Sequence, residues 1–280
     1  MKNNFHKKFP GKINYFILYK ILLLIWAQYV ILDKFTVLSN LHISIFHNRG
    51  VFRLISIDNF FDTHISVVFL LFLKISILAI LVLNFLQNNR TSLLIFIILI
   101  YIYELIKKGF GGHLDHRILT LYIFTLIIYI SLENDFTNLD DAFKFSYLFF
   151  FLQYFFIGIA RIFSGFPEVF LGSTFTDWII QRSLRPSYFN LEIGLKALEY
   201  LPTNFLNFIF FISTIFEVGA IFCILIRNKY SILICILLIF FHFGIYLFMS
   251  VNFIENIFLL LLFIYIVEKD GLNEKIYSIH

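Results

Sequence analysis

The sequence has little charge, because Asp, Glu, Lys and Arg make up only 14% of its 280 residues. A soluble globular domain is about one quarter charged and about half apolar, whereas 60% of this chain is hydrophobic. The shortage of charge excludes an ordinary soluble enzyme, and the hydrophobic content excludes a disordered protein. With a mean hydropathy of +0.87, the composition is typical of a polytopic membrane protein.

Basic clusters and cysteine motifs are also missing. The 22 Lys and Arg exceed the 18 Asp and Glu by little, and they are not gathered in one segment, which excludes nucleic acid as a partner. The two cysteines, Cys223 and Cys235, lie in separate apolar runs and form neither a paired redox motif nor a zinc-ligand cluster. Apolar runs are what the sequence has in abundance.

Those runs define the predicted fold. A hydrocarbon core of about 30 Å needs roughly 20 apolar residues per helix. We predict an all-α, polytopic transmembrane helical bundle of about eight spans with no soluble domain. The third, fourth and eighth runs are short, so seven spans is the alternative. The runs cover 15–32, 65–86, 92–104, 118–132, 145–163, 205–226, 232–250 and 253–267.

The chain has three predicted parts. Residues 1–14 form a basic leader, 15–267 form the bundle, and 268–280 form a polar C-terminal tail. The leader resembles the start of a signal peptide, but Lys20 interrupts the first run and no small-residue cleavage site follows. We therefore expect an uncleaved first span with the N-terminus in the cytoplasm. The polar stretches 33–64 and 164–204 are predicted to be interfacial loops with short amphipathic helices.

Titratable side chains inside the spans are functional candidates, because each costs several kcal/mol unless it is paired or hydrated. His242 lies in the middle of the seventh span, where one alternative is a neutral histidine satisfied by a single hydrogen bond. Glu217 lies inside the sixth span and is expected to pair with Arg161 or with His242.

A second group precedes the fourth span, in the segment GGHLDHR at 111–117. Asp115 can cap the helix that follows. His113 and His116 lie on one helical face, so a metal site with Asp115 or His242 is one alternative. Because no further ligand follows at helical spacing, we expect a single catalytic histidine and no metal.

The third group ends the fifth span, in YFFIGIARIF at 154–163. Gly158 allows another helix to approach closely. Arg161 either extends to the headgroups or faces the site. With eight spans, the loop after the third span and the end of the fifth lie on the same side of the membrane, so His113, His116 and Arg161 are predicted to converge above His242.

In this order, these motifs resemble the vitamin K-dependent gamma-carboxylase superfamily, specifically its short bacterial HTTM-type members. The matching segments are GHLDH at 112–116, YFFIGIARI at 154–162 with Gly172 downstream, and FHFG at 241–244 through Met249, all within residues 100–265. The resemblance implies a membrane bundle in the inner membrane of a bacterium, with a cavity on the non-cytoplasmic side and a reduced quinone as cofactor.

The candidate site residues combine this resemblance with the polar groups identified above. Arg161 and His116 correspond to catalytic positions of the family, and His242 is expected to complete the catalytic polar shell. His113, Tyr154 and Glu217 are expected to contact the substrate. The family has a basic lysine where this chain has Arg161, and a guanidinium stays protonated and cannot abstract a proton. Glutamate carboxylation is therefore not expected.

Two functions remain open at this point. One is a membrane enzyme that acts on a lipid-soluble quinol, a lipid or a peptide, with His116 as acid or base and Arg161 holding an anion or oxyanion. The other is a non-catalytic partner in maturation, export or immunity of a secreted peptide toxin. A carrier is disfavoured because the spans lack a ladder of acids or paired broken helices.

Overall fold

The structure is a computed structural model that describes residues 10–26, 65–86, 90–109, 116–131, 139–183, 193–226, 229–249 and 253–277. Helices form at every predicted span. They are α2 (Pro10–Trp26), α5 (Ile65–Leu86), α6 (Arg90–Gly109), α7 (His116–Ser131), α8 (Leu139–Gly165), α12 (Thr203–Gly219) with α13 (Phe222–Ile226), α14 (Lys229–Met249) and α15 (Ile254–Tyr277).

Three stretches of the described chain are long and apolar enough to cross a membrane: Asp141–Phe163, Thr203–Leu225 and Tyr230–Met249. Shorter apolar helices occur in the N-terminal half. Because lipid offers no hydrogen-bonding partners, a helix is the local structure that satisfies the backbone of such segments. The helical membrane-protein fold is thus confirmed, whereas the count of about eight spans stays a prediction.

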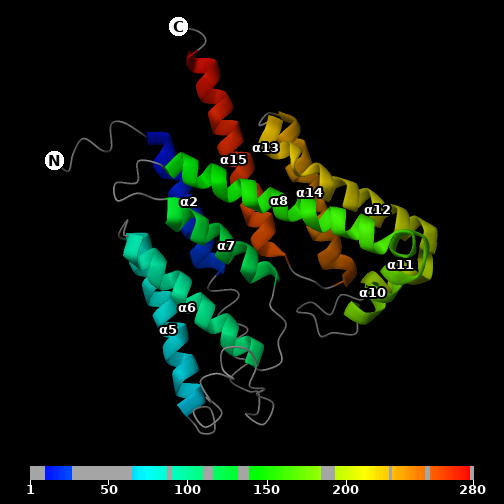
Figure 1. Ribbon diagram of the computed structural model, residues 1–280, viewed down its shortest axis with the longest axis horizontal. Coiled ribbons are helices and arrows are strands. Elements are labelled where there is room, and N and C mark those ends of the chain that lie inside the picture. Colours follow the sequence, from blue (N-terminus) through cyan, green and yellow to red (C-terminus); the bar gives the residue numbers. More distant parts are fainter. Residues whose placement is uncertain are drawn as a thin grey trace, which may run out of the picture. The chain divides into compact units, whose positions relative to one another are not determined.

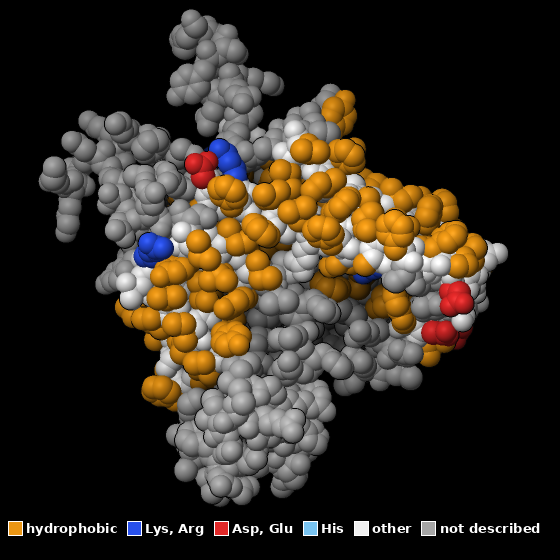
Figure 2. Space-filling model, in the orientation of Figure 1, with side chains coloured by type: hydrophobic (Ala, Val, Ile, Leu, Met, Phe, Trp, Pro, Cys, Tyr) orange, Lys and Arg blue, Asp and Glu red, His pale blue; other side chains and the backbone are white. Residues whose placement is uncertain are grey.

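Large apolar side chains face outward on many of these helices. Phe72 and Phe240 are each 67% exposed and Leu225 is 72% exposed. Figure 2 shows hydrophobic side chains over much of the described surface on one face, with few charged groups among them. Such a surface would be a liability in water but suits contact with lipid tails.

The helices group into two compact units, Met1–Ser146 and Tyr147–His280, and the division falls inside α8. In the first unit, the Tyr19 hydroxyl of α2 lies 2.5 Å from the Thr125 hydroxyl of α7. The rings of Phe16, Tyr19, Phe124 and Phe143 pack around this bond. A buried polar pair inside an aromatic cluster fixes how these helices meet.

The second unit contains the described candidate residues. Its α12 and α14 pack together, and the short helices α9 (Glu168–Leu171), α10 (Thr174–Ser183) and α11 (Ile193–Tyr200) lie near one end of this pair (Figure 1). Phe170, Phe175 and Ile179 pack with Leu206 and Phe210 of α12. The polar stretch 164–204 therefore includes short helices packed on longer ones, as predicted, whereas 33–64 lies outside the described residues.

Candidate functional site

Polar side chains occur at seven-residue intervals along α8, at Tyr147, Tyr154 and Arg161. Two helical turns separate successive members, so all lie on one face of the helix. Each side chain contacts a different helix of the second unit. Tyr147 donates to the Leu259 carbonyl of α15 at 3.0 Å, Tyr154 is hydrogen-bonded to His242 of α14, and Arg161 contacts Glu217 of α12 at 2.5 Å.

Arg161 and Glu217 form an ion pair. Nη1 of the arginine donates to Oε2 of the glutamate, whose side chain is only 4% exposed, whereas the arginine side chain is 27% exposed. The arginine neutralises a carboxylate that would otherwise be very costly in an apolar interior. Because a guanidinium has five N–H donors, Arg161 can donate to a further group as well.

Gly158 explains how the two helices come close enough for this pair. A Cβ atom at Gly158 would lie 2.8 Å from Cγ2 and 3.0 Å from the backbone nitrogen of Val218, the residue after Glu217. The missing side chain lets α12 pack directly on α8 one turn before Arg161. The close approach predicted from the sequence is confirmed.

A second polar contact centres on Tyr154. Its hydroxyl is hydrogen-bonded to Nε2 of His242, and a side-chain hydrogen bond also joins it to Asn256 of α15. Oδ1 of Asn256 has no partner, so the amide nitrogen donates to the tyrosine oxygen. The hydroxyl proton is then directed to Nε2, which places the proton of a neutral His242 on Nδ1.

His242 is 3% exposed, and its Nδ1 has no hydrogen-bond partner in the described structure. The imidazole packs against the ring of Phe253, with centroids 5.0 Å apart, and against Phe241 at 5.3 Å. An unpartnered N–H in such apolar surroundings is unfavourable. His242 is therefore only half satisfied by its protein neighbours.

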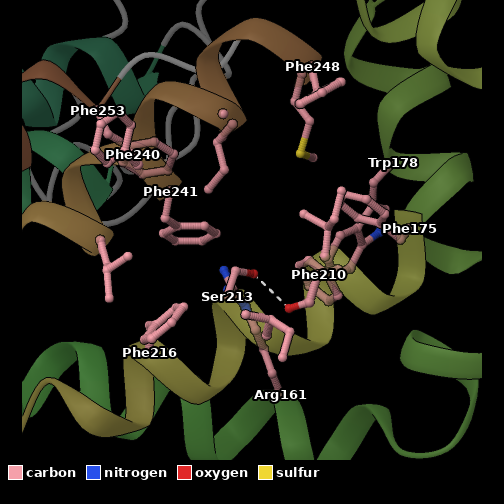
Figure 3. A pocket seen from close by; sticks show the side chains of 16 residues that line it. Arg161, Phe175, Trp178, Phe210, Ser213, Phe216, Phe240, Phe241, Phe248 and Phe253 are labelled. Atoms are coloured by element: carbon pink, nitrogen blue, oxygen red, sulfur yellow. Dashed lines mark hydrogen bonds between the residues drawn. The ribbon is translucent and has the colours of Figure 1, made fainter. Parts of the chain in front are cut away.

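A cavity of about 500 Å³ lies between α10, α12 and α14, with Arg161 of α8 in its wall. Half of its 16 lining residues are aromatic, and Arg161 is the only charged one among those described. Figure 3 shows the aromatic rings around the cavity and Arg161 reaching toward it from α8. The aromatic lining consists of Phe175, Trp178, Phe210, Phe216, Phe240, Phe241, Phe248 and Phe253.

Phe210 links the arginine to this aromatic wall. The guanidinium carbon of Arg161 lies 5.5 Å from the centroid of the Phe210 ring. Phe210 in turn stacks on Phe175 at 4.6 Å and meets Trp178 edge to face at 5.8 Å. A cation over an aromatic face is held in place by the ring quadrupole, so the ring and Glu217 together position the guanidinium at the cavity wall.

The structure brings together four of the six predicted site residues in the second unit: Tyr154, Arg161, Glu217 and His242. It resolves the alternatives for Glu217 in favour of Arg161. His113 lies outside the described residues, and His116 begins α7 but its side chain is not described. The predicted convergence of these histidines with Arg161 stays a prediction.

Sequence reasoning missed two features of this site. Asn256 went unnoticed because it lies at the start of a long apolar helix, although it is 8% exposed. The cavity went unnoticed because its aromatic residues do not differ from the many phenylalanines of the lipid-facing surface. The seven-residue spacing of Tyr147, Tyr154 and Arg161 was the available signal.

Within the described parts of the chain, no cluster of three or more His, Cys, Asp or Glu side chains is placed to hold a metal ion. Comparisons with known proteins give no further assignment. No protein family, curated protein or solved structure matches this chain.

Proposed function

We propose that this protein binds a lipid-soluble quinone or quinol in the cavity of the second unit, with Arg161 donating a hydrogen bond to a ring oxygen. The observation that supports this most directly is the guanidinium of Arg161 in the wall of an aromatic cavity of about 500 Å³. Cavities of roughly 300–1,000 Å³ with a few placed polar groups are typical small-molecule sites.

Charge complementarity favours a neutral ligand. Arg161 is already paired with Glu217, so the two side chains together are close to neutral. A carboxylate or phosphate ligand would compete with Glu217 for the guanidinium, and both anions would have to share an apolar site. A carbonyl or hydroxyl oxygen needs only one of the remaining N–H donors.

The aromatic wall of the cavity also favours a planar aromatic ligand. The rings of Phe175, Trp178 and Phe210 pack on one another and present faces and edges to the cavity. Offset and edge-to-face contacts between aromatic rings are favourable beyond the area they bury. The resemblance to the vitamin K-dependent carboxylase superfamily points to the same class of ligand.

The same proposal places the protein in a bacterial inner membrane with about eight spans and a cytoplasmic N-terminus. It includes a membrane enzyme in which His116, as the resemblance implies, transfers a proton to or from the bound ligand. Reporter fusions after residue 280 test the topology, because an even number of spans puts both termini in the cytoplasm. An external C-terminus with an internal N-terminus would require seven spans.

Trp178 provides a direct binding assay, because the chain has only one other tryptophan, Trp26. We expect the Trp26→Phe protein in lipid nanodiscs to show saturable fluorescence quenching by a short-tailed ubiquinone analogue. The Trp178→Phe protein should show only the unsaturable quenching caused by quinone dissolved in the lipid.

The role of the arginine is tested on the Trp26→Phe background. Arg161→Met combined with Glu217→Gln removes the donor without leaving an unpaired buried charge. A hydrogen bond from a charged donor contributes about 1.5–3 kcal/mol, so affinity should fall at least about tenfold. Arg90→Met, which removes a guanidinium from α6, is the matched control. Unchanged affinity in the double variant, or no saturable quenching at all, would contradict the proposal.

A further inference from the structure

The two cysteines, twelve positions apart in sequence, meet in the structure. Sγ of Cys223 on α13 lies 3.9 Å from Sγ of Cys235 on α14. Both residues are 0% exposed, and both are free thiols. They are the only cysteines in the chain, so its whole thiol content is concentrated at one contact.

The two thiols are oriented toward each other. Cys223 donates to the backbone carbonyl of Ser231 at 3.7 Å. Its sulfur is then left as the acceptor for the thiol proton of Cys235. A disulfide has an S–S length of about 2.05 Å, so the sulfurs must approach by about 1.9 Å from their 3.9 Å separation. Closure therefore requires rotation of the side chains and an adjustment of the helices.

Outward-facing apolar side chains are the sequence neighbours of both cysteines. Phe222, the residue before Cys223, is 49% exposed, and Ile236, the residue after Cys235, is 38% exposed. Both helices belong to stretches long and apolar enough to cross a membrane. The oxidant of this pair is therefore expected to come from the lipid, and it needs local displacement of the side chains that bury the thiols.

We infer that Cys223 and Cys235 form a redox-active dithiol that closes to an intramolecular disulfide when a lipid-soluble quinone oxidises it. Two S–H bonds break and one S–S bond forms. The two electrons and two protons released pass to the quinone, which becomes the quinol. The inference goes beyond the proposed function, because it does not require the cavity to be occupied.

The position of the pair gives the closed form a structural consequence. Cys223 follows shortly after Glu217 along the α12 and α13 segment, and Cys235 precedes the cavity residues Leu237, Phe240 and Phe241 on α14. A disulfide would join the segment that holds Arg161 in place to the helix that forms the opposite wall. Oxidation would therefore restrict separation of these two helices.

The inference is tested on the full chain in lipid vesicles. The protein is reduced with a phosphine, exposed to a short-tailed ubiquinone analogue, denatured, alkylated with a maleimide and analysed by mass spectrometry. The quinone ring is fully substituted, so it does not form stable thiol adducts. We expect the quinone-treated wild type to lose both maleimide adducts and to yield one cross-linked product containing Cys223 and Cys235.

Cys223→Ser and Cys235→Ser are the matched controls, and each should retain its single maleimide adduct after the same treatment. Diamide, a membrane-permeant thiol oxidant, shows whether the pair can close at all. Retention of both adducts by the quinone-treated wild type would overturn the inference, whether or not diamide closes the pair. A disulfide between two chains instead of within one would overturn it as well.

Discussion

Arg161 and Glu217 are joined by an ion pair of 2.5 Å that is unequally buried, because the arginine side chain is 27% exposed and the glutamate side chain is 4% exposed. The glutamate therefore depends on its partner more than the arginine does. A guanidinium at a cavity wall can be hydrated or can bind a ligand, whereas a carboxylate in an apolar interior has neither alternative.

This asymmetry predicts the order of stabilities in a mutant cycle. Arg161→Met leaves a buried carboxylate unpaired and should destabilise the protein by about 3 kcal/mol. Glu217→Gln should cost less, and the double variant should be more stable than Arg161→Met alone. Denaturant titration in detergent, monitored by circular dichroism, measures the free energy of unfolding of all three variants. A double variant no more stable than Arg161→Met would show that the two side chains are not coupled.

Gly158 offers a test of helix contact. Alanine there places a methyl group 2.8 Å from Val218 Cγ2 and 3.0 Å from the Val218 backbone nitrogen, so α12 must move away from α8. We expect Gly158→Ala to destabilise the protein by about 1–3 kcal/mol and to weaken ligand binding through displacement of Glu217.

Gly219→Ala is the matched control, because a Cβ at that position would meet no atom within 4 Å beyond its chain neighbours and the backbone of its own helix. Alanine there should be neutral or stabilise the protein by up to about 1 kcal/mol. Equal melting temperatures for Gly158→Ala and Gly219→Ala would mean that α8 and α12 do not pack as closely as the structure shows.

The hydrogen bond between Tyr154 and His242 predicts a loss of stability when the tyrosine hydroxyl is removed. Tyr154→Phe leaves both ring nitrogens of a buried histidine without a protein partner and should cost about 1–3 kcal/mol. Adding His242→Phe removes the unsatisfied imidazole and should recover part of that loss. Tyr200→Phe is the control, because Tyr200 is 80% exposed. Equal melting temperatures for Tyr154→Phe and Tyr200→Phe would contradict the buried bond.

Arg161 also predicts that the protein does not carboxylate glutamate. A guanidinium stays protonated and cannot deprotonate a quinol, so the purified protein with reduced vitamin K and labelled bicarbonate should not carboxylate a glutamate-containing peptide. The measurement is the amount of label incorporated into the peptide by the wild type, compared with that incorporated by the Arg161→Lys variant. Robust carboxylation by the wild type would require a base other than Arg161.

The sequence predicted the helices well, because unbroken apolar runs leave the backbone no other way to satisfy its hydrogen bonds in lipid. It predicted that Glu217 pairs with Arg161 or with His242, because charges inside such runs must be paired, and the structure shows the pair with Arg161. It did not predict that Cys223 and Cys235 meet, because their contact depends on how α13 packs against α14. It did not predict the cavity either, because a phenylalanine that lines the cavity and one that faces lipid have the same local sequence pattern.

The central claim is that the cavity of the second unit holds a quinone, and photo-cross-linking tests it most directly. The protein in its native membrane is illuminated with an azido-ubiquinone, digested and mapped by mass spectrometry, with unlabelled ubiquinone as competitor. We predict competed labelling of peptides that contain Phe210 and Ser213 on α12 or Phe240 and Phe241 on α14. Labelling confined to helices of the first unit, or labelling that the competitor does not reduce, would contradict the account.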